Sequence, residues 1–79
     1  MSYRVDLASR KVERQIRNLP PDAKPKIIEA IQRLSENPWP PGVEKIKGQY
    51  HRIRTGDYRI VYAILKKEKV IVITSLGIL

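Results

Sequence analysis

The 79-residue sequence contains no cysteine and only one histidine and one tryptophan. Without cysteine the chain can form neither a disulfide framework nor a thiolate metal site, which is ordinary for a cytosolic protein. No stretch approaches the roughly 20 apolar residues of a transmembrane helix, and the charged start MSYRVDLASR lacks the apolar run of a signal peptide. We therefore expect a cytoplasmic protein that does not associate with a membrane.

Most sequence signatures of enzymes are also missing. There are no carboxylates paired at a catalytic spacing, no Ser/His/Asp set and no cluster of metal ligands, and neither GxGxxG nor GxxxxGK[ST] occurs. We accordingly expect no metal ion and no cofactor. Metal-free phosphodiester cleavage stays open, because a 2′-hydroxyl can attack the adjacent phosphate while guanidinium groups stabilise the negative charge that develops.

Positive charge is what the sequence has in excess. Lys and Arg number 16 against eight Asp and Glu, a formal net charge of +8. Residues 45 to 79 hold eight of these basic side chains and only two acidic ones, so this half carries +6 and residues 1 to 44 carry +2. Such a distribution favours binding to polyanions, and phosphate is the expected ligand chemistry.

Hydropathy periodicity predicts a single α+β domain over residues 1 to 79. A half-buried strand over residues 2 to 7 is followed by a first helix from Ala8 to about Leu19. A second helix is expected to begin at the N-cap residue Asp22, with Pro25 in its first turn, and to end before Asn37. Three strands then follow over residues 46 to 54, 58 to 65 and 69 to 76. We expect a helical hairpin packed on a mainly antiparallel four-stranded sheet, in the order β-α-α-β-β-β.

Three arginines lie close together where the sequence HRIRTGDYRIVY predicts a β-hairpin. A two-residue Gly56-Asp57 loop would place Arg54 opposite Arg59 and would put Arg52 on the same face as both. A three-residue loop that includes Thr55 would instead mix the arginines with core residues. We favour the two-residue loop, while a β-bulge would make the other register feasible.

Like charges directly opposite one another destabilise a sheet by up to about 1 kcal/mol, so stability alone does not explain this cluster. A phosphate lying across the face would replace the repulsion with charge-assisted hydrogen bonds, for which forked guanidinium groups are well shaped. The alternative is a solvated face that deters edge pairing between molecules. We favour phosphate binding because most of the net charge lies in this half of the chain.

The aromatic and basic residues around the arginines each allow two interpretations. His51 is either a general acid or base or, as the favoured register indicates, a partly buried structural residue opposite Tyr62. Tyr50 shares a strand face with two of the arginines and could stack on RNA. Trp39 could stack on a base, but we expect it to cover the core beneath the end of the second helix. The lysines of residues 66 to 69 are typical of a solvated turn.

The sequence resembles the RelE/ParE superfamily of type II toxin–antitoxin toxins over nearly its whole length. The resemblance is carried by the order of elements and by RIRTGDYRIVY preceded by NPWPPGVEKIKG. It implies a compact fold like that of small microbial ribonucleases. It also implies a ribosome-dependent endoribonuclease that cuts mRNA and is neutralised by an antitoxin with an acidic or amphipathic segment, which alone would connect it to operator DNA.

By the same resemblance, Arg59 is expected to bind the scissile phosphate, and Arg52 and Arg54 to contact RNA and stabilise the reaction. The candidate RNA-binding residues are Lys45, Lys47, Tyr50 and His51. Active members continue past the last strand with a basic segment and a tyrosine, whereas this sequence stops at Leu79. We therefore expect attenuated cleavage. The alternatives are a ParE-like inhibitor of DNA gyrase and a non-cleaving homologue that only binds its antitoxin.

Overall fold

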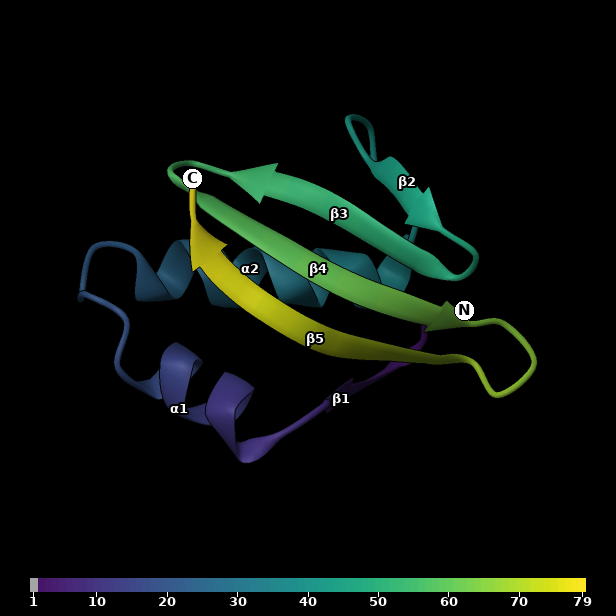
Figure 1. The fold of residues 1–79 in the computed structure, drawn as a ribbon, viewed down its shortest axis with the longest axis horizontal. Coiled ribbons are helices and arrows are strands. Elements are labelled where there is room, and N and C mark those ends of the chain that lie inside the picture. The colour runs from purple at the N-terminus through teal and green to yellow at the C-terminus, as the bar shows by residue number, and fades with distance from the viewer. Residues whose placement is uncertain (1) are drawn as a thin grey trace.

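The computed structural model describes residues 2–79 and contains two helices and five strands. In chain order the elements are β1 (Arg4–Leu7), α1 (Arg10–Arg17), α2 (Lys24–Glu36), β2 (Glu44–Lys47), β3 (Tyr50–Thr55), β4 (Tyr58–Leu65) and β5 (Val70–Ile78). Both helices lie on one face of the sheet and leave the other face uncovered (Figure 1). The α+β class is therefore confirmed.

The sheet is mixed and has the strand order β1-β5-β4-β3-β2. Neighbouring strands are antiparallel except for β1, which pairs in parallel with β5. The expected four-stranded sheet is wrong, because the strand predicted over residues 46 to 54 is two strands joined by a turn at Gly48-Gln49. Gly48 has a φ of 58°, a left-handed conformation that glycine adopts without strain and that ends the extended chain there.

The two helices begin and end close to the expected positions, but the N-cap residue of α2 differs from the expected one. The Ser9 hydroxyl accepts a hydrogen bond from the Val12 amide (3.3 Å) and so caps α1. The predicted N-cap at Asp22 is wrong: Ala23 holds the N-cap position of α2, with no side-chain cap, and Pro25 lies in the first turn as expected. Within residues 2–79, neither helix is long and apolar enough to cross a bilayer.

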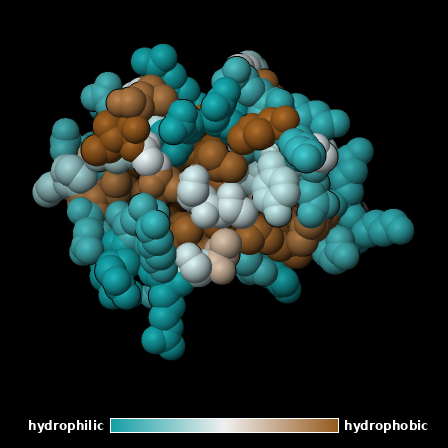
Figure 2. All heavy atoms as spheres, viewed as in Figure 1, coloured by the Kyte–Doolittle hydropathy of each residue, from teal (hydrophilic) through white to brown (hydrophobic). Residues whose placement is uncertain are grey.

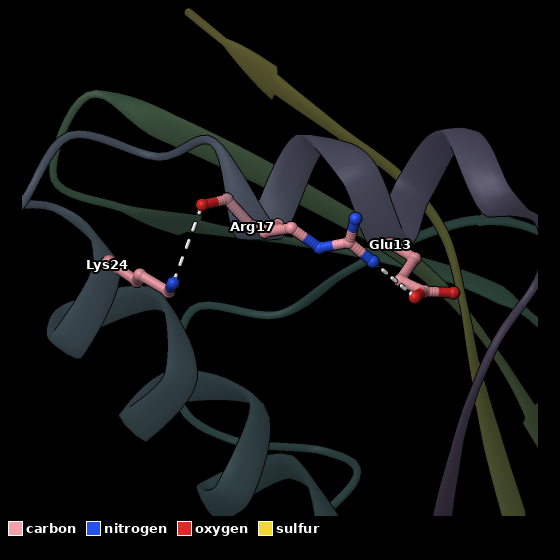
Figure 3. A network of polar contacts seen from close by, with 3 residues as sticks. All are labelled: Glu13, Arg17 and Lys24. Carbon is pink, nitrogen blue, oxygen red and sulfur yellow. Dashed lines mark hydrogen bonds and ion pairs between the residues drawn. The ribbon is translucent and has the colours of Figure 1, made fainter.

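A short polar network connects the end of α1 to the start of α2 (Figure 3). The Lys24 ammonium donates to the backbone carbonyl of Arg17 at 3.5 Å, and the Arg17 guanidinium pairs with Glu13 one turn earlier at 2.7 Å. A cation beside the last carbonyls of a helix is favourable because the helix dipole is negative there. The network therefore helps to hold the helices on the same side of the sheet.

The hydrophobic core lies between the helices and the inner face of the sheet. Its buried members are Val12, Ile27, Leu34, Ile53, Ile60, Tyr62, Ile64, Ile71, Ile73 and Leu76. Tyr62 is fully buried, and its hydroxyl donates to the backbone carbonyl of Pro38 at 2.8 Å. Burial raises the pKa of Tyr62 to about 12. This bond fixes the proline-rich loop that follows α2.

Trp39, the residue after Pro38, does not cover the core. Its side chain is 41% exposed, so the expected role beneath the helix end is wrong. The indole instead meets the Tyr3 ring edge to face, with 6.3 Å between the ring centroids. The Lys66 ammonium lies 5.3 Å from the centre of the indole. The buried residue of this loop is Pro38, and Trp39 faces the β4–β5 connection.

Candidate nucleic-acid interface

The β3–β4 hairpin has the register that the two-residue loop predicts. Arg54 pairs with Arg59 and Arg52 with Val61, while His51 pairs with Tyr62 on the inner face. Gly56 has a φ of 59° and is the loop residue with a positive φ, as expected for glycine at the first central position of a type II′ turn. Because side chains alternate along each strand, Arg52, Arg54 and Arg59 lie together on the helix-free face of the sheet. We call this surface the arginine face.

The three guanidinium groups differ in how many ion pairs and hydrogen bonds they form with neighbouring protein atoms. Arg52 forms an ion pair with Glu44 of β2, at 3.2 Å from its Nη2 and 3.3 Å from its Nε. Arg54 has one long contact, from Nε to the Gly56 carbonyl at 3.5 Å. The Arg59 side chain makes no hydrogen bond or ion pair with any residue of 2–79. Arg59 and Arg54 are therefore the groups most available to an anion.

The residue of β5 that lies beside Arg59 is a glycine, so β5 presents almost no side chain there. Gly77 is the residue opposite Arg59, and a Cβ built there would meet no atom within 4 Å. Ser75 is opposite Val61 and is exposed. A ligand can therefore approach Arg59 from the β5 side. Sequence reasoning missed both residues, because a bulge shifts the β4–β5 register between Val61 and Tyr62.

An apolar band crosses the helix-free face beside the arginines. Figure 2, seen from this side, shows hydrophobic residues at the centre of the face and hydrophilic residues around them. The register places Val61, Ala63, Leu65, Val70 and Val72 on this face. Tyr50, 44% exposed, pairs with Ala63 and adds an aromatic ring at the β3 side. The face thus combines cations with apolar and aromatic surface, a combination that suits a nucleic acid strand.

The four predicted RNA-binding residues do not form one group. Lys47 pairs with Tyr50, so both belong to the helix-free face, whereas Lys45 pairs with His51 on the other side of the sheet. His51 is 8% exposed and stacks on Tyr62 with 5.9 Å between ring centroids. The expected position of His51 opposite Tyr62 is therefore confirmed, and its side chain is buried. Any role of the four residues in RNA binding stays a prediction.

Metal-binding side chains do not gather anywhere in the part of the chain that the structure describes. No group of three or more His, Cys, Asp or Glu side chains comes close enough there to hold an ion. What the arginine face offers chemically is a set of fixed cationic hydrogen-bond donors. Each guanidinium group can donate one or two hydrogen bonds to phosphate oxygens and can stabilise additional negative charge that develops on them.

Comparison with known proteins shows the family to which the chain belongs. A family model described as the ParE toxin of the type II toxin-antitoxin system parDE matches residues 5–77. The chain belongs to the RelE/ParE toxin superfamily. This RelE/ParE toxin is 30% identical over 82 residues to RelE1 of Methanocaldococcus jannaschii, a match that covers 98% of the chain and 90% of the relative.

Solved structures of RelE proteins share the fold of this RelE/ParE toxin. RelE in the archaeal RelE–RelB complex from Pyrococcus horikoshii superposes with a TM-score of 0.88 and 32% identity, covering 99% of this chain and 96% of that one. The isolated E. coli RelE toxin gives a TM-score of 0.83 at 20% identity, covering 98% and 84%. The E. coli likeness concerns the fold alone, and the archaeal one also supports the superfamily assignment.

Proposed function

We propose that this RelE/ParE toxin is a RelE-like endoribonuclease of the cytoplasm that cleaves mRNA on the ribosome. The observation that carries the proposal is the directly opposed pair of Arg54 and Arg59, of which Arg59 makes no polar side-chain contact within residues 2–79. Two like charges opposite one another weaken a sheet. A phosphodiester bound between them would remove that repulsion, so the pair is suited to a ligand with two negative or strongly polar oxygens.

In the proposed reaction the 2′-hydroxyl oxygen attacks the adjacent phosphorus and the 5′-oxygen leaves. The products are a 2′,3′-cyclic phosphate and a 5′-hydroxyl, and the proton of the 2′-hydroxyl ends on the leaving oxygen. Arg59 and Arg54 would hold the non-bridging oxygens and stabilise the charge of the phosphorane. Arg52, which Glu44 already orients, would contact the neighbouring phosphate.

The proposal is tested by adding the purified protein to ribosomes programmed with mRNA and mapping new RNA ends by primer extension. Replacing a donor that stabilises a developing oxyanion costs roughly 10²- to 10³-fold in rate, so Arg59→Ala should reduce cleavage by that factor. Arg33→Ala is the matched control, since Arg33 is an exposed arginine on α2 that forms an ion pair with Glu29. Intact mRNA with the wild-type protein, or equal rates for Arg59→Ala and Arg33→Ala, would contradict the proposal.

We further propose that an antitoxin with an acidic or amphipathic segment binds the helix-free face and carries the only connection to operator DNA. The relative from P. horikoshii was solved as a RelE–RelB complex. Here the apolar band would take the apolar side of such a segment, and Arg54 and Arg59 its carboxylates. Addition of the antitoxin should then prevent RNA cleavage, and Val61→Lys should weaken its binding.

A second candidate function is inhibition of DNA gyrase through protein contact. It is favoured by one observation: the family model that matches residues 5–77 is that of the ParE toxin. A supercoiling assay with purified gyrase separates the two candidates, because a gyrase inhibitor should block supercoiling without cutting mRNA. Loss of supercoiling together with intact mRNA would replace the endoribonuclease proposal with this one.

A further inference from the structure

A second basic site lies at the other end of the β3–β4 hairpin from Gly56. It is a cavity of about 530 Å³, bounded by the Gly48-Gln49 turn and by the β4–β5 connection. The side chains that give it its chemistry are Trp39, Lys45, His51, Lys66, Lys67 and Glu68. The size falls in the range of small-molecule sites, roughly 300 to 1,000 Å³. From the sequence, ligand binding was a candidate role for Trp39, Lys45 and His51 but not for the residues of the β4–β5 connection.

The charge of this cavity is positive and not compensated by the protein. Lys45, Lys66 and Lys67 face one acidic side chain, Glu68, and none of the four belongs to an ion pair within residues 2–79. Lys66 contacts the indole of Trp39 instead, at 5.3 Å from the ring centre. Three ammonium groups around one hollow repel each other, and a bound anion removes that repulsion.

His51 supplies a hydrogen-bonding atom that the protein itself does not use. Its Nδ1 lies 3.1 Å from the Gln49 carbonyl, which can only accept, so Nδ1 carries the proton. The other ring nitrogen, Nε2, makes no hydrogen bond within residues 2–79. Within residues 2–79 no fully buried side-chain nitrogen or oxygen lacks a partner, so Nε2 must reach open space. An Nε2 atom that reaches open space would face the cavity, because His51 is only 8% exposed and lines it.

We propose that this cavity binds a phosphate group of the RNA whose scissile phosphate lies on the arginine face. The two sites are about 20 Å apart, because six residues of β4 at about 3.3 Å each separate Arg59 from Leu65. Along β3 the outer face runs from Arg54 through Arg52 to Tyr50, which pairs with Lys47 beside the Gly48-Gln49 turn. RNA that follows this line meets cationic or aromatic side chains throughout, and beyond the turn it passes round the end of the sheet to reach Lys45 and His51 on the other side.

That the ligand is RNA rests on the proposed function. That the cavity binds a phosphate group rests on the residues of the cavity alone. Lysine ammonium groups bind phosphate oxygens as point charges from several directions. His51 Nε2, the ring nitrogen without a proton, can accept a hydrogen bond from a ribose 2′-hydroxyl beside that phosphate. A segment of RNA on the arginine face would thus be held at two points, which fixes its direction across the sheet.

The chain provides its own reporter, because Trp39 is the single tryptophan and Lys66 lies over its ring. Trp39 fluorescence is followed while inorganic phosphate, AMP or a single-stranded RNA octamer is added at constant ionic strength. We expect a saturable change, tightest with the octamer. Lys45→Gln and Lys67→Gln keep the reporter pair and should each weaken phosphate and RNA binding about tenfold, the value of one charge-assisted hydrogen bond. Lys11→Gln, an exposed lysine of α1, is the matched control.

Any of four results would overturn the inference. The first is no saturable change with any of the three probes. The second is equal affinity of Lys45→Gln, Lys67→Gln and Lys11→Gln. The third is equal affinity for inorganic phosphate and the octamer, which would make free phosphate the ligand. If a polyglutamate peptide binds and none of the three phosphate probes does, the ligand of the cavity is a protein carboxylate and not RNA.

Arg59→Ala separates this inference from the proposed function. The variant should lose cleavage and keep the Trp39 signal with AMP, because Arg59 lies outside the cavity. Cleavage by a wild-type protein whose Trp39 does not respond would refute the cavity site alone. A lysine-dependent Trp39 response in a protein that never cuts mRNA would support the cavity and refute the endoribonuclease.

Discussion

The hydrogen bond from Tyr62 to Pro38 predicts a measurable loss of stability in Tyr62→Phe. The substitution removes one hydroxyl from a fully buried ring and leaves the Pro38 carbonyl without its 2.8 Å partner. An unsatisfied buried acceptor costs about 1–3 kcal/mol, so we expect a decrease of about 2 kcal/mol in the free energy of unfolding. For a domain of this size that corresponds to a Tm lowered by about 8–16 °C.

The same bond makes a prediction about pH. Burial raises the pKa of Tyr62 from 10.0 to about 12 in the folded protein, whereas the unfolded chain loses this proton near 10. Between those values the unfolded state binds fewer protons, so the stability that Tyr62 contributes is fully present below pH 10 and falls as the pH rises toward 12. Each pKa unit corresponds to about 1.4 kcal/mol. The difference in free energy of unfolding between wild type and Tyr62→Phe should therefore become smaller above about pH 10.

Urea denaturation followed by circular dichroism measures both effects, at pH 8 and at steps up to pH 11. Comparison with wild type at each pH cancels the titration of the lysines, which both proteins share. Tyr58→Phe is the matched control, since Tyr58 is only partly buried and its hydroxyl has no partner within residues 2–79. Two results would contradict the proposed role of this bond: unfolding of Tyr62→Phe at the wild-type urea concentration at pH 8, or a difference in the free energy of unfolding that stays constant to pH 11.

Three further predictions concern the sheet. Arg54→Gln should raise the free energy of unfolding by up to about 1 kcal/mol at low salt, because it removes the charge opposite Arg59. The gain should shrink in 1 M salt, which screens the repulsion. Thermal melts that show a lower stability at low salt would contradict this prediction. Lys69→Gly should raise the Tm, since Lys69 has a φ of 58°, and a lower Tm would show that its other contacts outweigh the strain. Gly77→Val should slow RNA cleavage by filling the space beside Arg59 while the circular dichroism spectrum is unchanged, and full activity would place the substrate elsewhere.

The β3–β4 hairpin could be predicted from the sequence because its information is local. Gly56-Asp57 fixes the loop length, and the alternation of buried Ile53 and Ile60 with exposed arginines fixes the faces. Both determinants lie within one turn and its flanking strands. The face that carries the candidate site therefore followed directly from the order of residues.

The features that escaped prediction depend on contacts between distant segments. The parallel pairing of β1 with β5 joins residues more than 60 positions apart, and no local pattern encodes it. The bulge at Thr74, whose hydroxyl donates to the Val61 carbonyl at 3.1 Å, shifts the pairing that places Gly77 beside Arg59. The cavity escaped for the same reason, since folding alone brings Trp39 beside residues 45 to 51 and 64 to 68.

The position of β5 in the sheet has a consequence for synthesis. This strand follows all other elements in the chain, yet it lies between β1 and β4 and supplies Ile71, Ile73 and Leu76 to the core. A nascent chain cannot close that core until residues 70–78 have left the exit tunnel. The hairpin that bears the arginines therefore lacks its β5 neighbour until those residues are free to pair, so the arginine face is completed by the last strand to be made.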